Sequence, residues 1–322
     1  MIRKLLFVAA AALLGTGAIA QSPPPPKLLV VISVDGLSSG LFAQYRPQFT
    51  GGLARLASGT VFPGASDAGA VGRPLGALMK GHWPASRDVA IAGERQSAKR
   101  IGGAGADQQW YWSGARFKSD LAATREPRTV AKVNALIGAA LAQPRPGLQP
   151  TAFCRSKAKP GGRQLARAAG DATALAASPE LDGDTLALAA GLVDELRLGR
   201  GSDPDTLAVD LSATANVAQG YGADSEEMCL QVTELDREIG DFLAFLDSRG
   251  IDYAVALAGR ATGATQHAVP ILFWRPGFRG ATNTASASTA DIAPTLGALV
   301  ALPVSSGAGH CLEGIPASCA PR

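Results

Sequence analysis

This sequence has few histidines, few aromatic residues and a small net charge. Its 322 residues include three histidines, 6% aromatic residues and 18% charged residues, and the formal net charge is +3. A chain so close to neutral lacks the basic surface that nucleic-acid binding depends on, so no nucleic-acid partner is expected. The partner remains unknown from sequence. After residue 20 no segment has the roughly 20 consecutive apolar residues that a membrane-spanning helix needs.

The first 20 residues resemble a secretory signal peptide. Arg3 and Lys4 precede an uncharged run that ends in the small-residue pattern Ala18-Ile19-Ala20. The alternative is a membrane anchor, for which the run is short. We expect cleavage before Gln21, which lowers the net charge to +1, and a periplasmic or secreted product. Residues 21–26 then form a proline-rich spacer and residues 27–322 one large domain.

The four cysteines all follow the expected leader. They are Cys154, Cys229, Cys311 and Cys319. An even number in an oxidising compartment predicts two disulfides, with three possible pairings. We favour Cys311–Cys319, which closes a short C-terminal loop, together with Cys154–Cys229. The alternative is four buried free thiols.

Short apolar runs alternate with helical patterns along the chain. Residues 27–34 form a continuous apolar run ending at Asp35-Gly36, which is typical of a strand buried on both faces. An Asp at that end lies where open α/β sheets place their ligands. Further strands are expected over residues 206–211, 253–258 and 269–274.

Helices are expected between these strands. Apolar residues recur every three or four positions over residues 228–246, with Asp224 and Glu227 placed as a capping box and Gly250 as a terminator. A second helix is expected over 184–198. Residues 102–116 are interpreted as a loop and hairpin, and residues 281–290 as an exposed loop. The alternation predicts an α/β fold, doubly wound, with a mostly parallel sheet between helix layers.

Seven stretches carry a resemblance that spans nearly the whole chain after the leader. In order, they are residues 28–45, 51–65, 88–117, 184–213, 222–259, 269–278 and 288–304. Together they resemble the alkaline phosphatase superfamily, in the branch with type I phosphodiesterases and nucleotide pyrophosphatases. The resemblance implies a phosphate-ester hydrolase with a two-zinc site at the strand ends, here with reduced cap insertions.

The resemblance assigns a role to each site position. Asp35 is the retained metal ligand, although an Asp before Gly36 is also a common turn cap. Residues 71–81 resemble T-x-x-G-H-x-T-x-x-T-G, and Val71 stands at the nucleophile position without a hydroxyl. Leu75 stands where the family often has His. No catalytic residue is therefore assigned.

The remaining zinc-ligand positions are also altered. Ala215 and Gln219 stand for an Asp and a His, and Gly259 and Arg260 for a second Asp-His pair. His267 lies near the expected place of a final ligand, but we interpret it as an edge-loop residue.

Two further observations bear on zinc and substrate binding. A two-zinc site of this kind needs about three histidines that converge on it. In this chain all three, His82, His267 and His310, would have to lie together. Where relatives carry K-D-R this chain has Glu94, Arg95 and Gln96. Arg95 is thus a candidate anion contact, or alternatively a solvated surface residue.

Three hypotheses follow from these residues. The favoured one is an exported pseudoenzyme without the nucleophile and most zinc ligands; zinc enters only if the family site is partly retained. The alternative is an active phosphatase or phosphodiesterase in which Asp35 and Asp210 share one hard metal ion, with Asp67 or His82. The third is a decaying gene whose product folds poorly.

Overall fold

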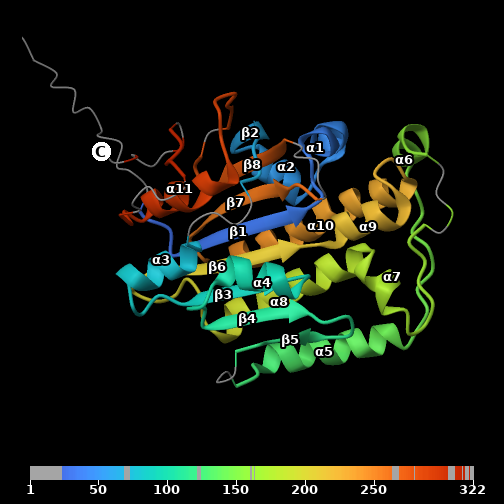
Figure 1. Cartoon of the computed structure of the whole chain (residues 1–322), viewed down its shortest axis with the longest axis horizontal. Helices are drawn as coiled ribbons and strands as arrows, with labels where there is room; N and C mark the ends of the chain where they lie inside the picture. Colours follow the sequence, from blue (N-terminus) through green and yellow to red (C-terminus); the bar gives the residue numbers. More distant parts are fainter. Residues whose placement is uncertain are drawn as a thin grey trace, which may run out of the picture.

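The computed structural model describes residues 24–68, 73–121, 125–159, 162, 164–262, 268–278, 280–303, 309–313, 315 and 319. These residues form a mostly parallel sheet of nine strands with helices on both faces (Figure 1). The α/β fold predicted from the sequence is confirmed. The expected leader, residues 1–20, lies outside the described residues, as do Val71 and His267. No described helix is long and apolar enough to cross a membrane.

The sheet places β1 near its centre. In spatial order the strands are β5 (Phe117–Lys118), β4 (Gln108–Trp112), β3 (Asp88–Ala92), β6 (Asp205–Leu211), β1 (Leu28–Asp35), β7 (Tyr253–Arg260), β8 (Val269–Trp274), β2 (Thr60–Ala65) and β9 (Ala281–Thr282). Strands β4, β3, β6, β1 and β7 are parallel, whereas β5 and β8 run antiparallel to their inner neighbours. The carboxyl ends of the central strands therefore meet at one edge.

Two helix layers cover the sheet. The helices are α1 (Ser39–Tyr45), η1 (Arg46–Gln48), α2 (Gly52–Ala57), α3 (Leu75–His82), α4 (Arg95–Gly102), α5 (Arg128–Leu141), α6 (Ala152–Lys157), α7 (Ala172–Ala176), α8 (Pro179–Glu195), α9 (Ala213–Tyr221), α10 (Glu226–Ser248), η2 (Thr289–Asp291) and α11 (Ile292–Leu299). Helices α2, α8, α9 and α10 cover one face, and α3, α4 and α11 cover the other. Helix α5 packs on the outer side of α8.

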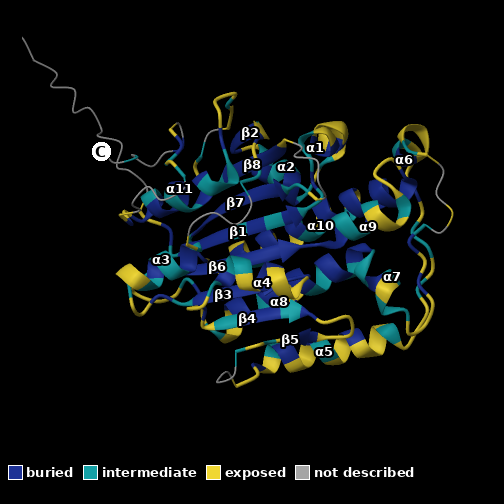
Figure 2. Ribbon diagram, viewed as in Figure 1, coloured by how far each residue is buried: buried dark blue, intermediate teal, exposed yellow. Residues whose placement is uncertain are grey.

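The two faces of the central strands differ in polarity. The even-numbered residues 28–34 of β1 belong to the larger apolar cluster, under α8 and α10. Leu29 belongs to the cluster under α3 and α11, and Ser33 and Asp35 follow on its side of the strand. The central strands β3, β6 and β7 are almost wholly buried (Figure 2). Polar groups therefore gather on the α3 and α4 face, toward the carboxyl edge.

The expected strands are present, with small shifts in their ends. Residues 269–274 match β8, while β6 begins one residue earlier and β7 runs two residues longer than predicted. The loop and hairpin expected over residues 102–116 agree with the structure, where β4 turns back and pairs antiparallel with β5; β4 also pairs in parallel with β3. The loop expected over residues 281–290 differs, because it contains β9, which pairs with β2, and the start of η2.

Two helix predictions need correction. The capping box of Asp224 and Glu227 is wrong, because Ser225 is the N-cap and its hydroxyl accepts from the Met228 N–H. Glu227 instead accepts a hydrogen bond from the Gln164 backbone N–H at 3.0 Å. The helix expected over 184–198 is α8, which starts at Pro179 because proline suits the first turn. Gly250 follows α10 with φ of +63°, as a terminating glycine does.

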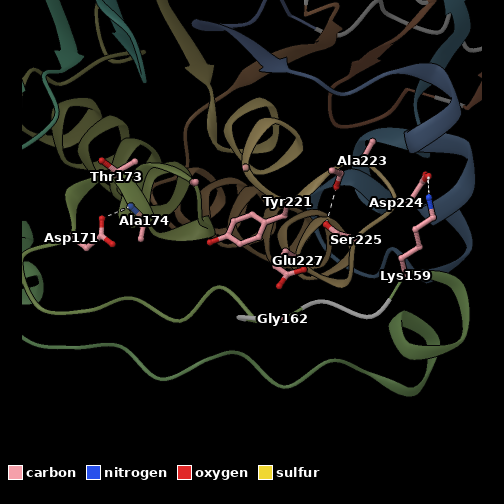
Figure 3. Close-up of a pocket in the computed structure, with 13 residues that line it drawn as sticks. Lys159, Gly162, Asp171, Thr173, Ala174, Tyr221, Ala223, Asp224, Ser225 and Glu227 are labelled. Carbon is pink, nitrogen blue, oxygen red and sulfur yellow. Dashed lines mark hydrogen bonds and ion pairs between the residues drawn. The ribbon is translucent and has the colours of Figure 1, made fainter.

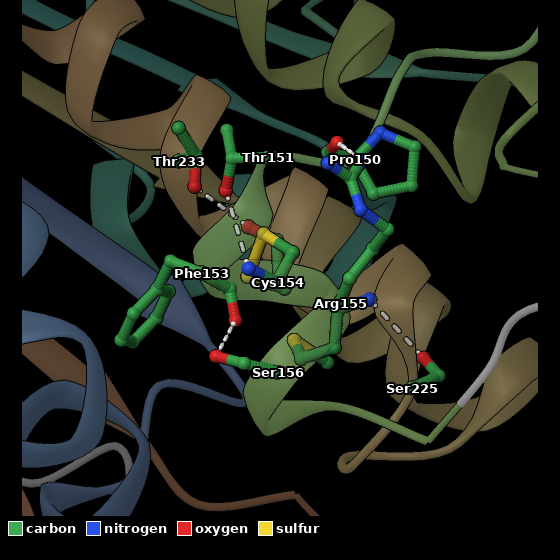
Figure 4. The surroundings of a disulfide bond; sticks show 10 residues. Pro150, Thr151, Phe153, Cys154, Arg155, Ser156, Ser225 and Thr233 are labelled. Atoms are coloured by element: carbon green, nitrogen blue, oxygen red, sulfur yellow. Dashed lines mark hydrogen bonds between the residues drawn. A yellow bond between two sulfur atoms is a disulfide. The ribbon is translucent and has the colours of Figure 1, made fainter.

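The structure contains the disulfides Cys154–Cys229 and Cys311–Cys319. Cys154–Cys229 joins α6 to the first turn of α10, and both residues are fully buried (Figure 4). The Thr151 hydroxyl accepts from the Cys154 N–H, and the Thr233 hydroxyl donates to the Cys229 carbonyl. The favoured cysteine pairing agrees with the structure, and the bond anchors α6 to the longest helix.

Three carboxyl groups on α8 and α10 are shielded from solvent, Asp182 and Asp184 on α8 and Glu238 on α10. Burial raises the pKa of Glu238 to about 9, with Asp182 as the next cause. Burial likewise raises the pKa of Asp182 to about 7, and that of Asp184 to about 7. Arg237 opposes the shift of Glu238 from 3.6 Å. At neutral pH this interface therefore holds protons that the unfolded chain releases.

We expect the protein to lose stability as the pH rises from about 5 to 9. Above the unfolded pKa values of 3.8 and 4.5 the native state binds more protons than the unfolded state, so the free energy of unfolding falls with pH. Each proton so held contributes about 1.4 kcal/mol per pH unit. Glu238→Gln should make the free energy of unfolding depend less on pH. Thermal unfolding at about pH 5 and pH 9 measures this dependence. Glu234→Gln, on the same helix but 30% exposed, is the control; equal slopes in both variants would contradict the assignment.

Candidate functional site

Asp35, the last residue of β1, lies beside Arg260, its partner in the register of β7. Paired residues of parallel strands point to the same face, here the face under α3 and α4. The Arg260 Nε lies 3.7 Å from the Asp35 Oδ1 and 3.8 Å from the Asp67 Oδ2. A guanidinium thus stands between two carboxylates from different segments.

Asp67 is fixed from two other sides. The Ala261 backbone N–H donates to its Oδ2 at 3.0 Å, and the Thr289 hydroxyl donates to its Oδ1 at 3.2 Å. The contacts of Arg260 Nε are longer than hydrogen bonds, so they are ion pairs. The Arg260 Nη1 is buried and has no hydrogen-bond partner among the described residues. The cluster is therefore held by charge and by the backbone of the β7 end.

Asp210 forms a second ion pair one strand away. It lies on β6 in register with Ser33, and its side chain is fully buried. The Arg100 Nη2 lies 3.0 Å from its Oδ1, and the Ser33 hydroxyl donates to the same oxygen. The sequence interpretation missed Arg100 and Ser33. Ser33 shares the strand parity of Asp35, which is a usable signal, whereas the position of Arg100 depends on how α4 packs.

The two carboxylates influence each other across the strands. Burial raises the pKa of Asp35 to about 8, with Asp210 as the second cause and Arg100 acting against the shift. Burial and Asp210 thus disfavour the charged form of Asp35, whereas the nearby guanidinium of Arg260 favours it.

The positions where the resemblance expects ligands are filled or closed. A Cβ on Gly259 would meet the Leu37 carbonyl oxygen at 1.9 Å, so that position has no room for a side chain. A Cβ on Gly36, which has φ of +85°, would meet the backbone N and Cα of Ala215 at 3.0 Å. Gln219 lies exposed on α9. Leu75 is buried at the start of α3.

The described histidines lie apart from this edge. His82 is exposed at the last position of α3 and stacks edgewise on Trp83, with ring centroids 4.4 Å apart. The His310 side chain is 67% exposed, and its Nδ1 lies 3.8 Å from Asp291. Of the residues offered from sequence around one metal, Asp35, Asp67 and Asp210 lie at the strand edge, whereas His82 lies at the end of α3.

Arg95 is exposed at the start of α4. Its Nε lies 2.7 Å from the Asp120 Oδ2, and its guanidinium lies 5.9 Å from the ring centre of Tyr111. Glu94 immediately precedes it. The expected anion contact therefore has an acidic partner of its own.

The sequence was compared with known proteins. No family model matches it. Alkaline phosphatase PhoK of Sphingomonas sp is 33% identical over 301 residues, covering 71% of this chain and 54% of its own. Alkaline phosphatase PhoD of Zymomonas mobilis is 30% identical over 300 residues, covering 71% and 52%. The crystal structure of alkaline phosphatase PafA has a TM-score of 0.76 at 13% identity, covering 92% of this chain and 100% of that one.

This chain belongs to the alkaline phosphatase superfamily. It spans about half the length of the curated relatives that it matches. A solved superfamily protein from Vibrio parahaemolyticus has a TM-score of 0.50 at 12% identity, and covers 87% of this chain and 67% of its own. The family expected from sequence is thus confirmed, and with it the fold.

The superfamily implies metal ions at the strand ends, and the described residues do not fit a two-zinc pair. A guanidinium stands between Asp35 and Asp67, where a metal would need carboxylate oxygens to itself. Gly259 and Ala215 offer no ligand atom. Within the described ranges no group of three or more His, Cys, Asp or Glu is placed to hold a metal. No reaction step is therefore derived through a metal.

A separate cleft of about 810 Å³ lies at the far end of α9 (Figure 3). Its labelled side chains are Lys159, Asp171, Thr173, Tyr221, Asp224, Ser225 and Glu227. The Tyr221 ring occupies its middle, between Asp171 on one side and Glu227 on the other (Figure 3). Helix α9, nine residues and so about 13 Å long, separates this cleft from the strand edge. It is not part of the superfamily site.

Proposed function

We propose that this protein is an exported member of the alkaline phosphatase superfamily that does not hydrolyse phosphate esters. The observation that carries the proposal is Arg260, whose guanidinium bridges Asp35 and Asp67. Arg100 plays the corresponding part at Asp210. Two fixed organic cations thus neutralise carboxylates at the edge where the superfamily needs metal ions.

A guanidinium supplies charge but little of the chemistry of a metal ion. It stays protonated at any pH a protein tolerates, and it has no open coordination site. It therefore does not generate a bound hydroxide, nor does it act as a Lewis acid on a phosphoryl oxygen. Charge balance at this edge is kept, whereas activation of a nucleophile is lost.

The nucleophile position supports the same proposal. Val71 carries no hydroxyl, so it forms no phosphoryl-enzyme intermediate. Restoring a hydroxyl at this one position would still leave Ala215, Gly259 and Arg260 without ligand atoms.

Export is supported by two independent features. Residues 1–20 have the pattern of a signal peptide. The two disulfides suit an oxidising compartment such as the periplasm. The fold with its two disulfides also argues against the hypothesis of a decayed product.

We expect the purified mature protein to contain no stoichiometric zinc and to leave p-nitrophenyl phosphate and bis-p-nitrophenyl phosphate intact, with or without added zinc. Metal analysis and both assays are run on the wild type, Val71→Thr and Asp35→Ala. The single restoration should rescue nothing. Wild-type activity that disappears in Asp35→Ala would refute the proposal and favour the alternative, a metal-dependent hydrolase with a remodelled site around Asp35.

A further inference from the structure

A small cavity of about 170 Å³ lies between the sheet and the layer of α3, α4 and α11. Its floor is formed by β1 and β6, and its walls include Arg73, Leu75, Arg100, Thr289 and Ala293. It adjoins the ion pairs described above, because Arg100 contacts Asp210 and Thr289 contacts Asp67. A cavity of about this size has room for a benzene-sized molecule.

One part of the cavity wall is cationic. The Arg100 side chain is about a quarter exposed. Its Nη2 donates hydrogen bonds to Asp210 and to the Ser97 hydroxyl. A guanidinium has five N–H donors, so these bonds use a minority of its capacity. Arg73 is exposed and donates through its Nη2 to the Ala77 carbonyl at 3.2 Å. A guanidinium group binds a carboxylate well, because its N–H donors match the two carboxylate oxygens.

Another part of the wall holds a buried acceptor. Asp88 is 1% exposed, and its Oδ1 accepts from the Thr206 hydroxyl at 2.8 Å. Its Oδ2 is buried and has no hydrogen-bond partner in the described part of the chain. Burial raises the pKa of Asp88 to about 6, so at neutral pH it is mostly a carboxylate. Such an acceptor is costly to leave unpaired, and a ligand that donates to it would remove the cost.

The rest of the wall is apolar. It includes Val31 and Leu207 from the sheet and Ile101 and Ile292 from the helices. A ligand that fits all three parts has an anionic group, a short apolar body and a hydrogen-bond donor at its other end.

We propose that this cavity binds a small aromatic or branched organic acid that carries a hydroxyl or amino donor, with its carboxylate on Arg73 and Arg100 and its donor on Asp88. This binding function is independent of phosphate-ester chemistry. It gives a superfamily member without the metal site a role in capturing small organic acids outside the cytoplasm.

The test is calorimetric titration of the mature protein with 4-hydroxybenzoate, with benzoate and phenol as matched probes. Benzoate lacks the donor and phenol lacks the anion, so each should bind at least tenfold more weakly, as loss of one buried polar contact predicts. Asp88→Asn should lower the affinity for 4-hydroxybenzoate to the affinity for benzoate. Arg73→Ala should weaken both acids and leave phenol unchanged.

Cavity filling provides the matched structural control. Ala293→Leu places a larger side chain in the cavity wall, whereas Ala298→Leu changes the same helix at a half-buried position outside that wall. The first should abolish binding and the second should keep it. If Ala293→Leu fails to fold, the exposed Arg73→Ala carries the test. No saturation of the wild type at about 1 mM, equal affinity for the three probes, or full binding by folded Ala293→Leu would each overturn the proposal.

Discussion

Replacing Arg100 with alanine is expected to lower the free energy of unfolding by about 3 kcal/mol, because it leaves a buried carboxylate without its cation. Asp210 is fully buried, and its charged partner in the described structure is Arg100. The Ser33 hydroxyl alone does not compensate a charge in this environment. Urea denaturation of the wild type and the variant at pH 7 measures the loss.

Two variants make this expectation specific. Arg95→Ala removes another arginine from α4, but one that is exposed and pairs with Asp120 at the surface. It should leave stability nearly unchanged, since exposed ion pairs contribute little. The double variant Arg100→Met with Asp210→Asn removes the pair as a unit and should recover most of the stability. A double variant as unstable as Arg100→Ala would contradict the charge-based explanation.

Removing the Cys154–Cys229 disulfide should cost more stability than removing Cys311–Cys319. The first bond closes a loop over a sequence separation of 75 residues and the second over 8. Because cross-link stabilisation grows with the loop closed in the unfolded chain, we expect losses of about 4.5 and 2.5 kcal/mol, respectively. The paired Cys→Ala variants, unfolded thermally under non-reducing conditions, give the comparison.

The location of the bonds strengthens this contrast. Cys154–Cys229 ties α6 to α10 inside the larger apolar cluster, whereas Cys311–Cys319 lies near the C-terminus. Dithiothreitol should therefore lower the melting temperature of the Cys311/Cys319 variant, which keeps the long-loop bond, more than that of the Cys154/Cys229 variant, which keeps the short-loop bond. A larger effect of the C-terminal bond would show that loop closure is not the dominant contribution.

Sequence patterns determined the architecture and much of what the site lacks. Continuous apolar runs such as residues 27–34 alternate with an amphipathic helix over 228–246, and that alternation is enough to predict a parallel sheet between helices. The resemblance identifies Val71 as the nucleophile position. The absence of a hydroxyl there is visible from the sequence alone. The number of cysteines allowed three pairings, and the favoured one agrees with the structure.

Tertiary structure decided what fills the site instead. Arg260 was predicted only as a missing ligand, yet the register of β7 against β1 places its guanidinium between Asp35 and Asp67. Arg100 contacts Asp210 although the two are 110 residues apart in the sequence, and Ser33 contacts it from 177 residues away. Local patterns report the period and type of residues, but which distant side chains meet depends on strand register and helix packing, which involve the whole chain. The altered ligand positions were therefore a prediction from sequence, whereas the placement of two arginines beside Asp35, Asp67 and Asp210 was decided by the fold.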